Sequence, residues 1–311
     1  MGVPVRAGQA LRVPSFAKIN LGLEVLGTRT DGTHELRTLF QTVSLADEIV
    51  LRPRPKANGV TVACDHPLVP NDGTNLAARA AEALRRHGQV EAGVHIEITK
   101  RIPVGGGLGG GSSNAAAVLL GLDRLWRLGL GPAGLHRLAR KLGADVPFFL
   151  LGGTALGLAR GDEVFPLRHQ IQARAVLVDA GFPVSTAAVF RRLDASLTPR
   201  ENSNSIFFFV SSDLEEKHAL RLLTNDLEKA ALEEAPALKQ RAELIRGVLV
   251  QAGAGLAALT GSGSTYFGLF DKAAKARRAG KILAAAGFTA LQARTVSLDQ
   301  YRRVWSGALG R

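Results

Sequence analysis

The sequence predicts an α+β protein of two units, residues 1–172 and residues 173–311. A chain of 311 residues is long enough for about two domains of ordinary size, each able to bury its own core. The first part contains segments with strand periodicity and segments with helix periodicity. A buried-looking strand at residues 175–178 begins a second alternation of strands and helices, for which we expect an αβ sandwich.

In the first unit, we expect strand-rich hairpins followed by a helix over Leu76 to Arg86. Apolar and polar residues alternate from Val94 to Ile98, which is the period of a strand. Two further helices are predicted from apolar residues on one face, the first over Val118 to Trp126 and the second over Leu135 to Leu142. The second helix should end at Gly143, in the manner of a C-cap.

The second unit should close with a strand at 264–270, a helix at 271–286 and a strand at 289–298. Between its two halves, the segment from Pro199 to Leu214 is rich in Asn and Ser but contains an apolar run from Ile206 to Val210. We expect a surface loop there, with one anchoring or partner-facing patch.

The composition favours a soluble cytoplasmic protein. A single cysteine, Cys64, excludes an intramolecular disulfide and suits a reducing cytosol. The first residues contain no apolar export segment, and the longest uncharged apolar stretch, Val146 to Ala159, is too short to span a bilayer. We therefore expect no membrane partner, and a monomer or a homodimer.

The net charge of +12 is compatible with nucleic-acid binding. However, the basic residues are scattered along the chain, and no aromatic-rich platform for single strands accompanies them. The densest basic cluster, from Lys272 to Lys281, is most simply the solvated face of a helix. We expect no nucleic-acid partner, because a positive field would also serve an enzyme whose substrates are polyphosphates.

The most informative segment is a glycine loop, in which six glycines occupy the seven positions from Gly105 to Gly111. Because glycine adopts positive φ at little cost, several backbone N–H groups can converge on one phosphate without a Cβ in the way. Ser112 and Ser113 then open a helix whose free N–H groups would face the same anion. The loop predicts a phosphate site. A flexible linker is the alternative, which the patterned flanks oppose.

Two commoner phosphate loops do not fit this segment. Gly105, Gly107 and Gly110 satisfy G-x-G-x-x-G, but a nicotinamide site needs that motif in the first βαβ unit and an acidic residue about 20 positions on. Here the loop lies about a third of the way along the chain, and the next acidic residue, Asp123, comes too early. No Lys precedes Ser112, which excludes a Walker P-loop.

The run from Gly105 to Ala116 resembles the second motif of the GHMP small-molecule kinases. Further segments resemble motifs of this family in the same order, namely Ala17 to Leu21 with Asp31 to Leu36, then Leu142 to Pro147, and then Leu259 to Ser264. The chain is thereby identified as a member of that family. The resemblance implies an N-terminal domain like ribosomal protein S5 domain 2, a ferredoxin-like C-terminal domain, and an active site in the cleft between them.

The resemblance also implies transfer of the γ-phosphoryl group of ATP to an alcohol, with Mg²⁺ accompanying the nucleotide. The ATP-binding positions that it implies are Asn75, Leu76, Lys100, Pro103, Val104, Gly105, Gly106, Gly107, Leu108, Gly109, Gly110, Gly111, Ser112 and Ser113. Ser113 could bind the metal or could equally bond the β-phosphate. No metal ligand is assigned.

The candidate catalytic residues are Asp145, which would accept the hydroxyl proton, and Lys18. By position alone, Asp145 equally fits a turn or capping residue. Lys18 shares a strand face with Asn20, Gly22 and Glu24, which equally fits a solvent-facing side. The resemblance gives both residues catalytic importance. If they meet, Lys18 would keep the carboxylate ionised and offer a cation to the acceptor oxygen or to the phosphoryl group.

Among GHMP kinases, the likeness is closest to those whose acceptor alcohol contains a cytidine diphosphate group. It implies acceptor recognition by Asn20, Thr33, His34, Thr186 and Phe190. Thr186 and Phe190 would hold the cytidine, and His34 would bond the edge of the base. The family usually has Tyr where this chain has Thr33, so one face of an aromatic sandwich around cytosine is missing.

Two other functions stay open. Another GHMP kinase, acting on homoserine or mevalonate, is one alternative, although the turn from Asp31 to Leu36 favours the cytidyl acceptor. A non-enzymatic basic protein that shares only the S5-like fold is the other, but it would have no use for a glycine loop beside Asp145.

Overall fold

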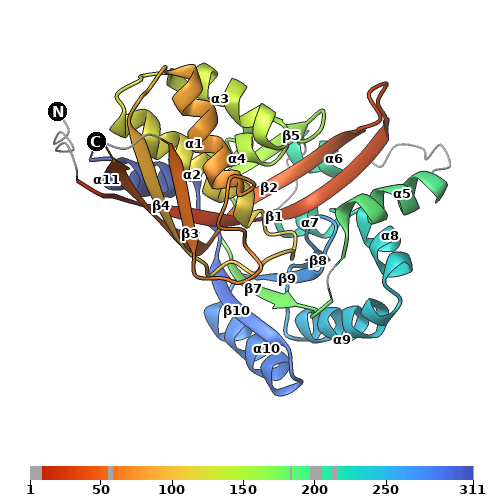
Figure 1. The fold of residues 1–311 in the computed structure, drawn as a ribbon. Helices are drawn as coiled ribbons and strands as arrows, with labels where there is room; N and C mark the ends of the chain where they lie inside the picture. The colour runs from red at the N-terminus through yellow and green to blue at the C-terminus, as the bar shows by residue number, and fades with distance from the viewer. Residues whose placement is uncertain (1–8, 55–58, 183, 197–204, 212–215, 311) are drawn as a thin grey trace.

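The computed structural model describes residues 9–54, 59–182, 184–196, 205–211 and 216–310. Two β-sheets form its framework, and Figure 1 shows one above the other with helices on their outer sides. Among these described residues, no helix combines the length and the apolar character needed to cross a membrane.

The first sheet has the strand order β3-β4-β2-β5-β6, and β1 also pairs with β2. Its strands are β1 (Leu11–Thr28), β2 (His34–Arg54), β3 (Val60–Cys64), β4 (Gly93–Thr99), β5 (Thr154–Leu158) and β6 (Glu163–Pro166). β1 and β2 form a long antiparallel hairpin that runs from the pair Leu11 and Leu51 to the pair Thr28 and His34. This hairpin is long enough to take part in both halves of the molecule.

Helices pack on the first sheet and enclose the first core. They are α1 (Leu76–His87), α2 (Gly110–Leu125), α3 (Gly131–Leu142) and α4 (Val146–Leu151). The predicted helix over 76–86 and the predicted strand over 94–98 are confirmed. α3 ends at Gly143 as predicted, although Gly143 has extended backbone (φ 172°) rather than the left-handed conformation of a usual glycine cap.

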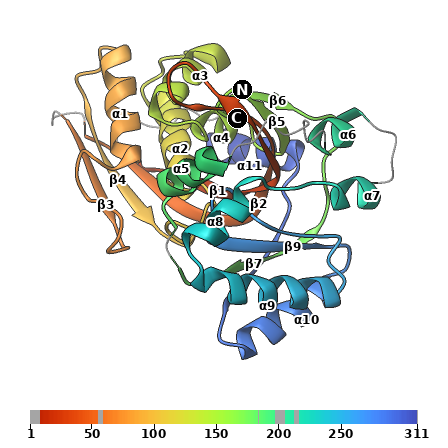
Figure 2. The same cartoon turned by 90° about the vertical axis from the view of Figure 1, so that its right-hand side faces the viewer.

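The second sheet has the order β10-β7-β9-β8 and is antiparallel throughout. Its strands are β7 (Arg174–Asp179), β8 (Leu256–Leu259), β9 (Thr265–Phe270) and β10 (Thr289–Arg294). α9 (Ala237–Gln251) and α10 (Ala273–Ala285) cover one face, as Figures 1 and 2 show. The chain order βαββαβ together with this strand order is ferredoxin-like, as the resemblance implied.

Shorter helices lie between β7 and α9, namely α5 (Thr186–Ser196), α6 (Ser205–Ser211), α7 (Glu216–Arg221) and α8 (Leu227–Glu234). The prediction of a loop over 199–214 is wrong for residues 205–211, which form α6. The short apolar run there is helical because Ile206 is fully buried against β1, while Phe207 and Phe208 stay exposed. The rest of that predicted loop lies outside the described residues.

A third core joins the two sheets. Ile19 and Leu21 of β1 pack there with Leu177 of β7 and Phe267 of β9. The opposite face of this part of β1, which carries Lys18, Asn20 and Glu24, is not exposed to solvent either. These residues are 3%, 2% and 0% exposed. The solvent-facing alternative for Lys18 is therefore wrong, since packing against the second sheet buries both faces of this strand.

The predicted strand over 289–298 is too long. β10 ends at Arg294, and Ser297 begins a capping box with Gln300 that starts α11 (Leu298–Ala308). α11 leaves the second sheet and places Tyr301 and Trp305 in the first core. The last helix of the described chain therefore completes the core of the first sheet.

This packing predicts that Trp305→Ala destabilises the protein strongly. Trp305 is 6% exposed, and loss of a buried Trp side chain costs about 3–5 kcal/mol in the free energy of unfolding. Its neighbour Val304 is 42% exposed, so Val304→Ala should change that free energy by less than about 0.5 kcal/mol. Urea unfolding of both variants measures the difference, and equal midpoints would show that α11 does not contribute to the core.

Candidate active site

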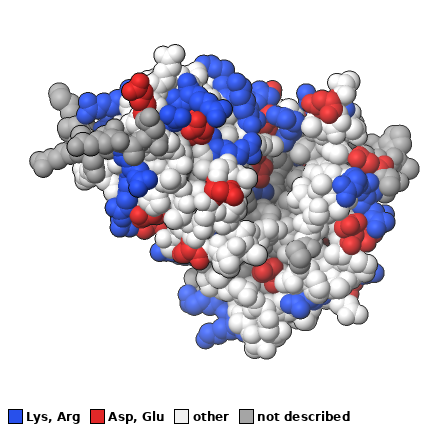
Figure 3. All heavy atoms as spheres, in the orientation of Figure 1, with Lys and Arg blue, Asp and Glu red and all other residues white. Residues whose placement is uncertain are grey.

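A cavity of about 700 Å³ lies between the two sheets. Figure 3 shows this face of the molecule hollowed near its centre. The cavity is lined by most of the residues that the sequence assigned to the site: Lys18, Asn20, Asn75, Leu76, Lys100, Pro103, Val104, Gly105, Gly106, Gly107, Leu108, Gly109, Gly110, Gly111, Ser112, Asp145, Thr186 and Phe190. Three assigned residues, Ser113, Thr33 and His34, are not among the lining residues.

The glycine loop has the backbone that the sequence predicted. Gly105, Gly107 and Gly109 have φ angles of 79°, 76° and 71°, which only glycine adopts readily. α2 starts directly after Gly109, at Gly110 rather than at Ser112, and no side-chain cap bond is found at this N-terminus within the described chain. The N–H groups of its first turn are thus left for an anion.

The loop is held from both sides. The amide of Lys18 donates to the carbonyl of Leu108 at 3.0 Å, and the amide of Thr265 donates to the carbonyl of Gly106 at 3.3 Å. A Cβ on Gly109 would lie 2.8 Å from Phe149 Cζ and 3.1 Å from Lys18 Cγ. Gly109 therefore allows close packing of the loop against the protein, rather than close approach of a phosphate at that point.

Beneath the loop, Asp47 on β2 is a buried carboxylate that sequence analysis missed. It bonds Lys100 Nζ at 2.5 Å and accepts hydrogen bonds from the amides of Arg101 and Ile102 and from Asn114 Nδ2. These bonds fix the connection from β4 to the loop and join it to α2. In the sequence, Asp47 stands only as one of two adjacent acidic residues within a predominantly apolar strand.

Ser113 lies on the protein side of α2 and is 2% exposed. Its hydroxyl oxygen accepts a hydrogen bond from the Ser15 hydroxyl at 2.8 Å, and Asn114 also donates to Ser15. The structure therefore places Ser113 in a buried network and gives no support to its assignment as a phosphate or metal ligand. Its neighbour Ser112 faces the cavity.

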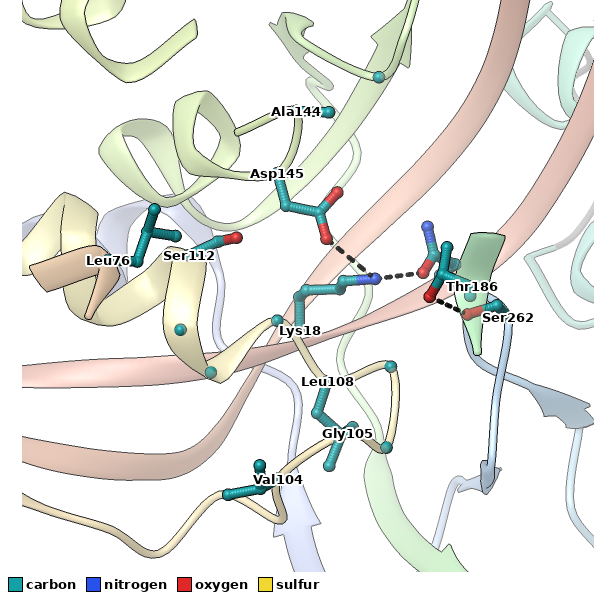
Figure 4. A pocket seen from close by; sticks show the side chains of 18 of the residues that line it. Lys18, Leu76, Val104, Gly105, Leu108, Ser112, Ala144, Asp145, Thr186 and Ser262 are labelled. Atoms are coloured by element: carbon teal, nitrogen blue, oxygen red, sulfur yellow. Dashed lines mark hydrogen bonds and ion pairs between the residues drawn. The ribbon is translucent and has the colours of Figure 1, made fainter. Parts of the chain in front are cut away.

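At the centre of the cavity the predicted pair meets (Figure 4). Lys18 Nζ lies 3.5 Å from Asp145 Oδ2 and donates a hydrogen bond to Asn20 Oδ1 at 2.5 Å. Asn20 is fixed in turn, because its Nδ2 donates to the Thr38 hydroxyl at 2.7 Å and its amide donates to the Thr260 hydroxyl at 2.9 Å. The Lys18 side chain is 4% exposed and that of Asp145 is 33% exposed.

Asp145 occupies the residue before α4, but its carboxylate makes no capping bond to the described helix. The side chain points instead toward Lys18 and the cavity (Figure 4). This arrangement differs from the turn or capping role that its sequence position equally allowed. A carboxylate that faces the cavity in this way can accept a proton from a bound hydroxyl group.

At the far end of the cavity, Phe190 of α5 is covered by the ring of His34. Their ring centroids are 4.4 Å apart with planes at 27°, and His34 Nε2 lies 2.7 Å from Asp194 Oδ1. Thr33 turns away, because its hydroxyl and amide both donate to Asp31 and lower the pKa of that carboxyl. The ring of His34, and not the side chain of Thr33, therefore stacks on Phe190.

Thr186 lies nearer the centre of the cavity, where its hydroxyl lies 2.7 Å from that of Ser262 (Figure 4). A Cβ on the adjacent Gly261 would lie 3.5 Å from Asn20 Oδ1. Gly261 and Ser262, in the turn between β8 and β9, also line the cavity. The sequence motif from Leu259 to Ser264 pointed to this turn but not to its role. Arg160 lines the cavity as well, and no sequence motif contained it.

Within the described parts of the chain, no group of three or more His, Cys, Asp or Glu residues could hold a metal ion. Lys18 and Lys100 are the cations beside the catalytic centre and the loop. The arrangement thus provides backbone donors for phosphates, a cation, and a carboxylate that faces the cavity, which together suit phosphoryl transfer to an alcohol.

The fold and this site define a small-molecule kinase of the GHMP class. The model of the GHMP kinases N terminal domain matches residues 75–153, and that of the GHMP kinases C terminal domain matches residues 210–288. A solved homoserine kinase from Cytophaga hutchinsonii has the same fold, with a TM-score of 0.72 at 18% identity, and covers 93% of this chain and 95% of its own.

Other relatives are much more similar in sequence. The chain is 44% identical over 282 residues to 4-diphosphocytidyl-2-C-methyl-D-erythritol kinase of Gloeobacter violaceus, covering 89% of this chain and 91% of that one. It is 42% identical over 303 residues to the enzyme of the same name from Solibacter usitatus, with 95% and 92% covered. A crystal structure of 4-(cytidine 5'-diphospho)-2C-methyl-D-erythritol kinase matches with a TM-score of 0.74 at 37% identity, with 92% and 99% covered. The chain belongs to the family of 4-diphosphocytidyl-2-C-methyl-D-erythritol kinases.

The loop geometry predicts the effect of Gly111→Ala. Gly111, in the first turn of α2, lines the cavity. A Cβ at this residue would meet no described atom within 4 Å. The methyl group should obstruct the phosphates and weaken ATP binding by about tenfold, which is ~1.4 kcal/mol. Isothermal titration with ATP measures this.

Gly247→Ala in α9 is the matched control, because its Cβ would also meet nothing within 4 Å of the described chain, and Gly247 does not line the cavity. Both variants should fold at least as stably as the wild type, since Ala is the better helix former. An ATP affinity that Gly111→Ala leaves unchanged would mean that the phosphates do not lie at this helix end.

Proposed function

We propose that the protein transfers the γ-phosphoryl group of ATP to the 2-hydroxyl of 4-diphosphocytidyl-2-C-methyl-D-erythritol, in the non-mevalonate route to isoprenoid precursors. The observation that best supports this reaction is the contact between Lys18 and Asp145 directly beside the glycine loop. Membership of the kinase family supplies the reaction.

Asp145 would accept the proton of the attacking hydroxyl as the bond to phosphorus forms. Lys18, at 3.5 Å from Asp145, would offer its charge to the acceptor oxygen or to the transferred group. Asn20 holds Lys18 in place, so that little reorganisation is needed during the reaction. The backbone N–H groups of the glycine loop and of the first turn of α2 would bind the phosphates of ATP.

Mg²⁺ bound with ATP would cancel part of the phosphate charge. The residues present fit such an ion in the way that nucleotide sites commonly do, with one or two protein oxygens and the remaining ligands from phosphates and water. Ser112 and Asp145 present side-chain oxygens to the cavity and would be the protein contacts. Ser113 is too deeply buried in its own network for this role.

The acceptor would lie with its alcohol at Asn20 and Asp145 and its cytosine against Phe190. The base would lie against the part of the Phe190 ring that lines the cavity and that His34 does not cover, and His34 would bond the edge of the base. Thr186, nearer Asn20, would hold the rest of the nucleoside. An aromatic face in the same cavity as the catalytic centre suits a nucleoside better than homoserine or mevalonate. We therefore favour the cytidyl acceptor over those of the distant fold relatives, and we do not favour a non-enzymatic function.

An ATP-coupled assay of the wild type with the cytidyl acceptor, homoserine and mevalonate tests the proposed substrate. In the same assay, Asp145→Asn should lower kcat by about 10²–10⁴, because the variant keeps the shape of the side chain but cannot accept a proton. The affinity for ATP should change little. Turnover at the wild-type rate by this variant would refute the role of Asp145.

Phe190→Ala should raise KM for the cytidyl acceptor about 5- to 150-fold, the equivalent of ~1–3 kcal/mol for one base stacked on an aromatic ring. KM for ATP should stay the same. Phe165→Ala is the control, since Phe165 is 48% exposed on β6 and does not line the cavity. If both variants bind the acceptor equally well, the base does not rest on Phe190.

A further inference from the structure

One face of β2 connects the two ends of the acceptor pocket. Side chains on one face of a strand recur every second residue, so His34, Leu36, Thr38 and Phe40 share a face. Leu36, Thr38 and Phe40 line the cavity, and His34 lies on Phe190 at the base end. Thr38 accepts from Asn20 at the catalytic end, so four residues of strand, roughly 13 Å, separate the two ends.

The turn between β5 and β6, residues 159–162, lies beside the middle of this face. The amide of Leu36 donates to the carbonyl of Ala159 at 2.5 Å. A Cβ on Gly161 would lie 3.8 Å from Thr38 Cγ2, so the turn also touches the next residue of that face. Arg160, between these two contacts, lines the cavity, and its charge acts on Asp31 in the turn between β1 and β2.

Arg160 is held by a carboxylate that is itself outside the cavity lining. Asp162 is fully buried, and its Oδ2 accepts from Arg160 at 2.9 Å and from Arg140 of α3 at 2.8 Å. Burial favours a higher pKa for Asp162, but these hydrogen bonds outweigh it and lower the pKa below its ordinary value. Because two guanidinium groups share one carboxylate, Arg160 retains charge for a ligand while its position is fixed.

We propose that Arg160 binds the diphosphate of the acceptor, and that Asp162 is the positioning residue that aims it. This inference rests on the proposed function. An acceptor whose alcohol lies at Asn20 and whose base lies at Phe190 must place its diphosphate between them, beside Leu36 and the turn. The planar fork of a guanidinium group matches phosphate oxygens in two parallel hydrogen bonds, and its charge makes those bonds stronger than neutral ones.

The test uses Arg160→Ala with cytidine, CMP and CDP as competitive inhibitors against the cytidyl acceptor. KM for the acceptor and Ki for CDP should rise about 10- to 100-fold, in line with the loss of charge-assisted hydrogen bonds. Ki for cytidine, which has no phosphate, should not change, and KM for ATP and kcat should stay close to wild type. Added salt should weaken CDP binding more in the wild type than in the variant.

Arg168→Ala is the matched control, because Arg168 is exposed beyond β6 and does not line the cavity. Arg160→Lys should recover part of the lost CDP affinity, since it keeps the charge but not the fork. If Asp162 acts through Arg160, Asp162→Asn alone should raise Ki for CDP. The double variant Asp162→Asn, Arg160→Ala should have the same Ki for CDP as Arg160→Ala alone. Melting curves show whether the Asp162 variant is folded. The arginine variants test phosphate binding by Arg160 independently of the Asp162 variant.

An unchanged Ki for CDP in Arg160→Ala would overturn the proposal. An equal rise for cytidine and CDP would also overturn it, by showing that Arg160 contacts the nucleoside. These outcomes differ from failure of the proposed function, in which the wild type itself would neither phosphorylate the cytidyl acceptor nor bind CDP.

Discussion

The burial of Lys18 is the constraint on which the site depends. An ammonium group with 4% of its side chain exposed needs partners, because an unpaired charge in such a place loses its proton or destabilises the fold. Asn20 and Asp145 are those partners, and each comes from a different part of the first unit. Asn20 is in turn bonded to Thr260 of the second sheet. The position of Lys18 therefore depends on the assembly of both sheets around it.

The phosphate loop shows the same principle in its supports. Its glycines give the loop its conformation, but its position depends on Asp47 and on the amide of Lys18. Since β1 supplies both Lys18 and a contact to the loop, a shift of that strand would move the two together. The position of the glycine loop relative to Lys18 is thus set by one strand.

Sequence analysis identified the elements whose signal is local. The glycine loop, the helix after it, and the alternating strand before it could all be predicted, because glycine content and periodicity reflect backbone needs directly. The meeting of Lys18 and Asp145 followed only from the family resemblance, since 127 positions separate them in the sequence. Spacing alone fitted a solvent face and a capping residue equally well.

The residues that were missed depend on tertiary contacts. Asp47 and Arg160 stand in no motif, and only the packing of distant strands brings them to the site. Ser113 was assigned to ATP binding, but it is buried and bonded to Ser15, because a helix start does not reveal which of two adjacent hydroxyls faces the cavity. The helix after residue 297 was missed although its capping box, and the apolar Tyr301 and Trp305 four residues apart on one face, are both visible in the sequence.

The return of α11 to the first sheet also bears on how the chain folds. Tyr301 and Trp305 belong to the same core as Phe16 and Leu122, so the first core lacks part of its apolar surface until residues near 309 are available. N-terminal domains commonly fold first during synthesis. Here the first unit would leave the ribosome well before residues 298–308 of α11 are made. Its early state would be incomplete, and the second sheet would form while the first still exposes the groove that α11 fills. The two units are therefore coupled in folding as well as in catalysis.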